Sequence, residues 1–157
     1  MGKAVITITP GESTATIERT FDAPRDKVFK AMTTKELIEK WWVGPGFTTT
    51  VEEYNPHDGG TWKFLHVKGD EKYHFFGVFH EVSPERVIQT FEFDGLPERG
   101  HVIMQRMELT ETSDGKTKMR ITETYFSVAD RDGMYQTGAE AGLNASYDAL
   151  DKVLAEL

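Results

Sequence analysis

The spacing of apolar residues changes along this chain, and each change predicts a new type of element. Across Ser13–Phe21, β-branched and polar residues alternate, which is typical of a strand. After Pro24, which suits the first turn of a helix, apolar residues recur at helical spacing. This pattern predicts two short helices, the second capped by Thr33 or Thr34 and ended by Gly44-Pro45-Gly46.

The next part of the chain is rich in strand-forming residues, interrupted by short turn sequences such as NPHDGG, KGDE and SDG. Links this short favour antiparallel neighbours, because parallel strands need long crossover connections. Six further strands are therefore expected in an antiparallel sheet: Phe47–Tyr54, Thr61–Val67, Tyr73–Val82, Arg86–Phe93, Val102–Thr112 and Lys116–Phe126.

The C-terminal segment, Asp130–Leu157, predicts one long helix with a broad apolar face. A sheet with one apolar face must bury that face, and this helix is the expected cover. The predicted fold is α+β: a curved antiparallel sheet of six or seven strands around a long C-terminal helix, with two short helices after the first strand. Residues 1–12 form an extension that could add a strand, and residues 13–157 form a single domain.

Two adjacent tryptophans, Trp41 and Trp42, end the second predicted helix. Neighbouring helix residues point ~100° apart, so the two rings cannot share one narrow face. One ring can enter a core, and the other must find a second apolar surface or face a groove.

Large aromatic residues also recur on one alternation phase of several strands, where they either fill the core or line a space beneath the helix: Trp62 and Phe64, Phe75 and Phe79, Phe91 and Phe93. The C-terminal helix carries a stripe of small residues that includes Gly138 and Gly142. Because glycine weakens a helix by ~1 kcal/mol relative to alanine, the stripe needs a reason. It permits either close packing against a neighbour or empty volume for a ligand.

Composition narrows the function classes. The chain has 157 residues, 18 Lys and Arg against 26 Asp and Glu, and a net charge of −8, which argues against nucleic-acid binding. It has no cysteine, so disulfides and thiolate chemistry are excluded. Apolar runs are too short for a membrane span, and no secretory signal is evident, so a cytoplasmic location is expected.

Candidate catalytic chemistry is sparse. His74 and His80 share a strand face but would lie ~20 Å apart, too far to bind one ion, so neither a metal nor any other cofactor is expected. No nucleophile motif or phosphate-binding loop is present. Charged residues on two neighbouring strands form either cross-strand ion pairs or a buried Arg–Glu pair that could orient a polar ligand: Arg106, Glu108, Arg120 and Glu123.

Several motifs in order resemble a known superfamily. RTFDAPRDKVFKAMT, WWVGPGF, HDGGTWKF and GVFHEVSPERVIQTFEF together resemble the START-like (SRPBCC, birch-pollen-allergen-like) superfamily. Within it the chain is most similar to homologues of the activator of the 90-kDa heat-shock chaperone ATPase, the AHSA-domain proteins. The family name suggests a stress-response role. The sequence departs from the family pattern at Asn55 and His57, where Asp and Arg are common, and at Leu143, where Trp is common.

The resemblance implies the helix-grip fold with a cavity between the sheet and the C-terminal helix. It places Trp41 in the core, and Trp42 and Phe47 beside the cavity entrance, where Gly44 and Gly46 let the chain turn. The expected function is binding of a small apolar or amphipathic ligand. The residues expected to line the site are Trp42, Phe47, Trp62, Phe64, Phe79, Phe91, Met104, Gly138 and Gly142.

Two other functions remain open. One is a chaperone co-factor or protein-interaction domain, with a heat-shock chaperone as partner. The other is an enzyme of the cyclase or hydrolase type, which would need an acid–base pair that the sequence does not locate. A monomer or weak dimer is expected in each case.

We predict that the folded protein needs no metal, because its histidines are too dispersed to form a site. Treatment with a chelator should leave the melting temperature unchanged in a thermal unfolding experiment. A drop of several degrees that zinc reverses would contradict this prediction.

Overall fold

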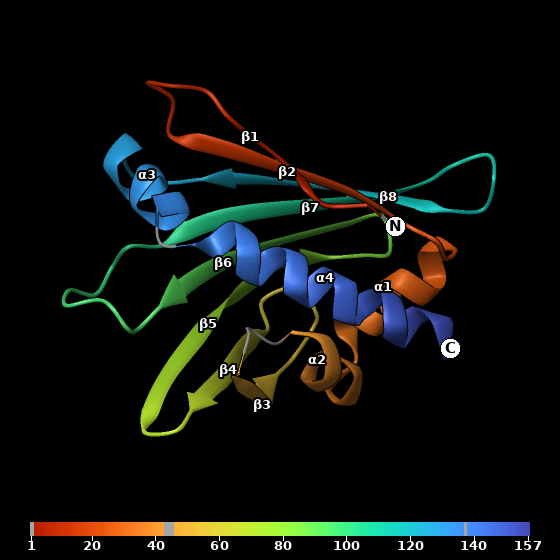
Figure 1. Cartoon of the computed structure of the whole chain (residues 1–157), viewed down its shortest axis with the longest axis horizontal. Coiled ribbons are helices and arrows are strands. Elements are labelled where there is room, and N and C mark those ends of the chain that lie inside the picture. The colour runs from red at the N-terminus through yellow and green to blue at the C-terminus, as the bar shows by residue number, and fades with distance from the viewer. Residues whose placement is uncertain (1, 43–45, 137) are drawn as a thin grey trace.

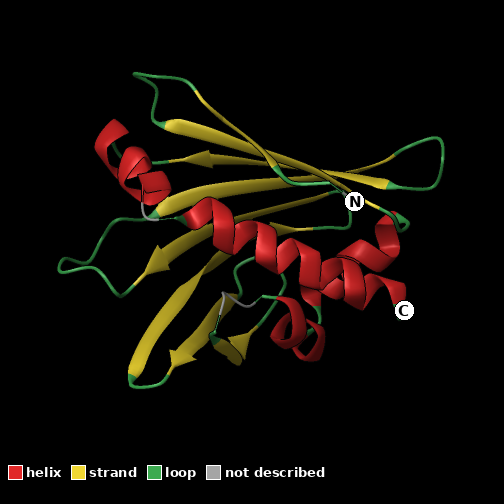
Figure 2. Cartoon of the chain, in the orientation of Figure 1, coloured by secondary structure: helices red, strands yellow, loops and turns green. Residues whose placement is uncertain are grey.

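An antiparallel sheet forms the body of the computed structural model, which describes residues 2–42, 46–136 and 138–157. Over these residues the sheet has eight strands, in the order β1-β2-β8-β7-β6-β5-β4-β3 (Figures 1 and 2). The strands are β1 (Val5–Ile8), β2 (Thr14–Phe21), β3 (Thr48–Tyr54), β4 (Thr61–Lys68), β5 (Glu71–Val82), β6 (Arg86–Phe93), β7 (Ile103–Glu111) and β8 (Thr117–Thr124).

The topology follows from the short links. Strands β3 to β8 form a meander in which each pairs with the next, and β8 then pairs with β2 along its whole length. The six or seven predicted strands become eight, because Val5–Ile8 in the N-terminal extension pairs with β2 as an edge strand. Its four residues are β-branched, which suits an edge position.

Helices cover one face of this sheet, in the helix-grip arrangement that the sequence predicts (Figure 1). Helices α1 (Arg25–Thr33) and α2 (Lys35–Trp41) follow β2, and α3 (Val128–Gln136) precedes α4 (Ala139–Ala155). The predicted single helix over Asp130–Leu157 is wrong in this respect. Gly138 has φ of +83°, a left-handed conformation that separates α3 from α4.

Only the C-terminal half of α4 is packed as a conventional core helix. Its buried residues are Tyr147, Leu150, Val153 and Leu154. They share one apolar core with Phe21 of β2 and Ile38 of α2. Helices α1 and α2 also contact α4. The first half of α4 has no fully buried residue.

An ion pair between β2 and α4 holds this packed half in place. Arg19 is buried, and its guanidinium donates two hydrogen bonds to the carboxylate of Asp151, at 2.9 and 2.7 Å. The same group donates to the Gly2 carbonyl at 2.9 Å and lies 4.7 Å from the centre of the Phe21 ring. Burial alone would raise the pKa of Asp151, but hydrogen bonds and positive charge, those of Arg19 foremost and then those of the N-terminal amine, lower the pKa.

We predict that Asp151→Asn lowers the free energy of unfolding by ~1–3 kcal/mol, because it leaves a buried guanidinium without its bidentate partner. Asp148→Asn is the matched control. Asp148 also meets Arg19, at 3.4 Å, but its side chain is 71% exposed, so a loss below ~1 kcal/mol is expected. Urea unfolding at pH 7 measures both, and equal losses would contradict the assignment.

The same pair predicts a pH dependence. The pKa of Asp151 in the folded protein lies below its value of about 3.9 in the unfolded chain. The ionised Asp151 side chain therefore contributes its full share of the unfolding free energy above about pH 3.9. It is lost as the pH falls through the folded pKa. The difference in unfolding free energy between the wild type and Asp151→Asn should therefore shrink below about pH 4. A constant difference down to pH 2 would show that the charge of Asp151 does not matter.

Candidate functional site

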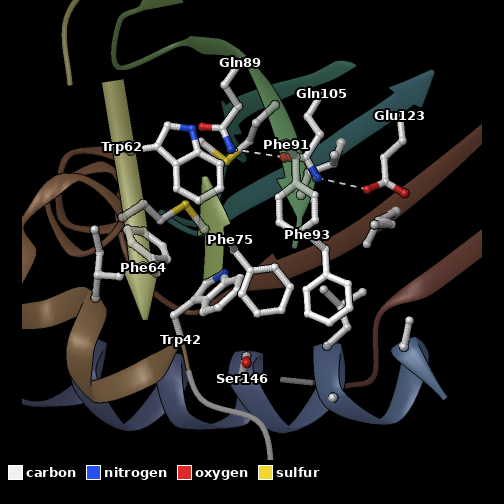
Figure 3. A pocket seen from close by; sticks show the side chains of 18 of the residues that line it. Trp42, Trp62, Phe64, Phe75, Gln89, Phe91, Phe93, Gln105, Glu123 and Ser146 are labelled. Atoms are coloured by element: carbon white, nitrogen blue, oxygen red, sulfur yellow. Dashed lines mark hydrogen bonds between the residues drawn. The ribbon is translucent and has the colours of Figure 1, made fainter. Parts of the chain in front are cut away.

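A cavity of about 550 Å³ lies between the sheet and the first half of α4. Residues from α2, α4 and strands β3 to β8 contribute to its walls. Figure 3 shows aromatic side chains of the sheet pointing toward α4 across this space. None of the helices in the described part of the chain is long and apolar enough to cross a membrane.

The cavity exists because the first half of α4 carries small side chains. Gly138, Gly142 and Ser146 line it from the helix side. A Cβ atom built on Gly138 or Gly142 would meet no other atom within 4 Å, so neither glycine serves close packing. The small-residue stripe was expected to serve either close packing or empty volume for a ligand. At Gly142 the missing side chain leaves empty volume. At Gly138 the left-handed backbone gives a second reason for glycine.

The apolar wall is a network of aromatic rings. Trp42 meets Phe64 and Phe75 edge to face, with ring centres 5.1 and 4.8 Å apart. Phe75 in turn stacks on Phe93 at 4.9 Å, and Trp62 lies 4.9 Å from Phe64. Rings in such contacts hold one another in place, so the wall is preformed.

His66 is also part of the cavity wall, and its ring meets that of Trp42 edge to face. The Thr49 hydroxyl donates its hydrogen to the Trp42 carbonyl, so Nδ1 of His66, 3.1 Å from that hydroxyl, must be the donor to it. The His66 ring also stacks on Phe47 at 4.3 Å. Burial lowers the pKa of His66, which favours the neutral ring at pH 7.

One line of polar groups crosses the otherwise apolar sheet surface. Gln89, Gln105 and Glu123 lie directly opposite one another on β6, β7 and β8. Gln89 donates to Gln105 at 3.0 Å, and Gln105 donates to Glu123 at 3.0 Å, as Figure 3 shows. We call these three residues the polar ladder. Glu123 is buried and also accepts hydrogen bonds from the hydroxyls of Tyr125, at 2.8 Å, and Tyr135.

Both tyrosines keep their hydroxyl protons and donate to Glu123. Burial, with the nearby charge of Glu123, raises the pKa of Tyr125 and Tyr135.

Trp62 has a buried donor without an acceptor. Its indole Nε1 has no hydrogen-bond partner among the described residues. The ring is only 3% exposed and forms part of the cavity wall.

The structure brings together eight of the nine residues expected to line the site. The residues on the cavity wall are Trp42, Phe47, Trp62, Phe64, Phe79, Phe91, Gly138 and Gly142. The expectation for Met104 is wrong. Met104 is 45% exposed on the opposite face of β7, because Gln105 and Met107 occupy the inward phase of that strand.

Strand alternation places the charged residues of β7 and β8 on different faces of the sheet. Arg106 and Arg120 are exposed, and Arg106 pairs with Glu108 at 3.5 Å on the outer face. Glu123 reaches the cavity, but its partners are tyrosines and a glutamine, so the alternative of a buried Arg–Glu pair is wrong. The roles of Gln89 and Gln105 were missed, because they depend on strand register, which no local motif reveals.

The histidines do not converge. His74 lies between two carboxylates, with Nε2 3.2 Å from Glu52 and Nδ1 2.9 Å from Asp94, and His101 meets Asp130 at 3.0 Å. Across the described residues, no group of three or more His, Asp or Glu side chains could hold a metal ion. Of the predicted turn Gly44-Pro45-Gly46, the first two residues lie outside the described residues, and Gly46 has φ of +79°.

Residues 22–155 match the model of the family described as activator of Hsp90 ATPase homolog 1-like protein. No curated protein matches the chain. Among solved structures, a Rhodobacter sphaeroides protein is 23% identical with a TM-score of 0.87, over 97% of this chain and 99% of its own.

Two further solved structures are similar. A Mycobacterium smegmatis protein is 23% identical with a TM-score of 0.85, over 96% of each chain. An Arthrobacter aurescens protein is 21% identical with a TM-score of 0.84, over 98% of this chain and 92% of its own. At these identities the likeness concerns the fold alone.

The two adjacent tryptophans should differ in their contribution to stability. Trp41 is 7% exposed and donates a hydrogen bond from Nε1 to the Ala31 carbonyl at 2.9 Å. Trp41→Ala should therefore cost ~3–5 kcal/mol of unfolding free energy. Both tryptophans line the cavity, but Trp42 is only half-buried, so Trp42→Ala should cost less. Denaturant unfolding measures both, and equal losses would contradict the distinction.

Proposed function

This chain belongs to the activator of Hsp90 ATPase homolog 1-like family, and we propose that it is a member that binds a small apolar or amphipathic ligand in the cavity between its sheet and α4. The observation that carries the proposal is the cavity itself, about 550 Å³ in a chain of 157 residues. Protein interiors are normally packed to the density of organic crystals. A space of this size lies within the range of small-molecule sites.

The chemistry of the wall supports a ligand that is largely apolar. Aromatic rings dominate it, and those of Trp42, Phe75 and Phe93 contact one another. A ligand ring inserted among them would gain ~0.5–1.5 kcal/mol per aromatic contact beyond the burial of its apolar area. Ligand burial would also restore packing contacts that the empty space withholds from its wall.

Binding is better supported than catalysis. Acid–base catalysis needs a titratable side chain that is free to exchange a proton with the substrate. Glu123, the carboxylate on the wall, already accepts hydrogen bonds from Gln105, Tyr125 and Tyr135. These partners hold it as a structural acceptor at one end of the polar ladder.

The second candidate is a chaperone co-factor. Its support is the family description, which names an activator of the Hsp90 ATPase. Such a role would use exposed residues rather than the cavity. The two candidate functions therefore predict different effects of substitutions in the cavity: ligand binding should be weakened, and stimulation of a chaperone ATPase should not.

We predict that the protein binds the neutral apolar dye Nile red with one-to-one stoichiometry, measured by fluorescence titration. Phe93→Ala should weaken binding about tenfold, the factor that corresponds to the loss of ~1.4 kcal/mol of aromatic contact. Trp42→Ala should weaken it similarly. Met104→Ala is the control, since Met104 lies on the opposite face of the sheet, and it should bind like the wild type.

Two results would count against the proposal. One is equal dye affinity in the wild type, Phe93→Ala and Trp42→Ala. The other is clear stimulation of an Hsp90-type ATPase that the cavity variants leave intact, which would favour the chaperone co-factor instead.

A further inference from the structure

The polar ladder has a fixed direction. Glu123 accepts two tyrosine hydroxyls on one carboxylate oxygen, and Gln105 approaches the other oxygen. A carboxylate in this position can only accept, so Gln105 must present its NH₂ group to it. The carbonyl oxygen of Gln105 then points to Gln89, which must present its own NH₂ group in turn.

This direction determines the chemistry at the far end of the ladder. The Oε1 atom of Gln89 remains as an acceptor that no other member of the ladder uses. Had the line ended on a cation instead of Glu123, the same two glutamines would be reversed, and the far end would be a donor. The buried carboxylate therefore sets the polarity of a group two strands away.

A lone donor lies at the same end of the cavity. Trp62 and Gln89 both line the cavity, and no hydrogen bond joins them. Gly77 lies directly opposite Trp62 on β5. A Cβ atom at Gly77 would come within 1.9 Å of the carbonyl oxygen of Thr90, the residue after Gln89, and within 2.8 Å of Nε1, so this edge of the indole reaches the β6 backbone next to Gln89. A buried N–H without a partner is unusual in proteins and unfavourable.

We propose that Trp62 and Gln89 form the polar subsite of the cavity and that its ligand is an uncharged amphipathic molecule anchored there by a hydroxyl group. The ligand oxygen accepts from Nε1 of Trp62, and the ligand O–H donates to Oε1 of Gln89. The apolar body of the ligand packs against the wall of Trp42, Phe75 and Phe93. This inference rests on the proposed function, because it names the class of ligand for the same cavity.

The charges of the wall select against an anionic ligand. No lysine or arginine is among the described residues that line the cavity, whereas the carboxylate of Glu123 is. A fatty acid or other carboxylate would have to leave water without meeting a counter-ion. The negative charge of Glu123 would oppose it further. A hydroxyl group pays neither of these penalties.

The test compares three ligands of nearly equal shape by isothermal titration calorimetry: 4-hydroxybiphenyl, 4-methylbiphenyl and biphenyl-4-carboxylate. The wild-type protein should bind the hydroxyl compound about tenfold more tightly than the methyl compound, a factor that corresponds to ~1.4 kcal/mol. The carboxylate should bind more weakly than the hydroxyl compound by at least the same factor.

Two variants test whether the preference for the hydroxyl compound depends on Trp62 and Gln89. Trp62→Phe removes the N–H and keeps a ring, and Gln89→Met removes the acceptor and keeps the side-chain length. Each should reduce the hydroxyl preference from about tenfold to about threefold, as expected for the loss of one of two hydrogen bonds that share ~1.4 kcal/mol. Phe93→Leu is the matched control: it should weaken the hydroxyl and methyl compounds by the same factor and leave their ratio unchanged.

The possible failures are distinguishable. Equal affinity for the hydroxyl and methyl compounds in the wild type would overturn the subsite and leave the proposed function intact. A preference that survives in both variants, or tighter binding of the carboxylate, would overturn it as well. If no compound of the three binds, both the inference and the proposed function fail. The wild-type comparison needs no variant, so the test stands even if Trp62→Phe does not fold.

Discussion

A single helix must cover the apolar face of the sheet, and this constraint shapes the rest of the molecule. Helix α4 has 17 residues, about 25 Å at 1.5 Å per residue, and it cannot fill the space over a wide curved sheet. Its second half, from Tyr147 to Leu154, carries large side chains and builds the core with α1 and α2. The residues of its first half that face the sheet are small except for Leu143, so the cavity is the part of the core that α4 leaves unfilled.

The two halves of α4 have different roles: the second half packs in the core and the first half borders the cavity. This division allows a chain of 157 residues to have a hollow interior. The far end of α4 is held by its buried side chains and by the ion pair between Arg19 and Asp151. The first half of α4 has no fully buried residue, so changes to its own side chains should weaken the fold less than changes in the second half. A ligand that binds the folded state alone would also stabilise the protein by mass action, to an extent set by its concentration and affinity.

The sequence predicts most of this architecture but not the chemistry of the cavity. Strand alternation and turn residues locate β2 to β8 to within a few residues, because these signals are local. Two errors have local causes: the left-handed Gly138 divides the predicted helix, and the phase of β7 turns Met104 outward. The polar ladder could not be foreseen, because whether Gln105 faces Glu123 depends on strand register, a property of paired strands rather than of either one.

The polar ladder also explains how an apolar cavity can hold a charge. Glu123 is costly to bury, and three hydrogen bonds offset that cost. Of the two tyrosines that supply part of this support, Tyr125 directly follows β8 and Tyr135 lies in α3, and the division of the C-terminal segment at Gly138 gives α3 a direction of its own. The break in the helix, the buried carboxylate and the direction of the glutamines thus form one causal sequence. It ends at the Gln89 carbonyl, so the cavity wall carries a line of polar groups from Glu123 to Gln89 among aromatic and aliphatic side chains.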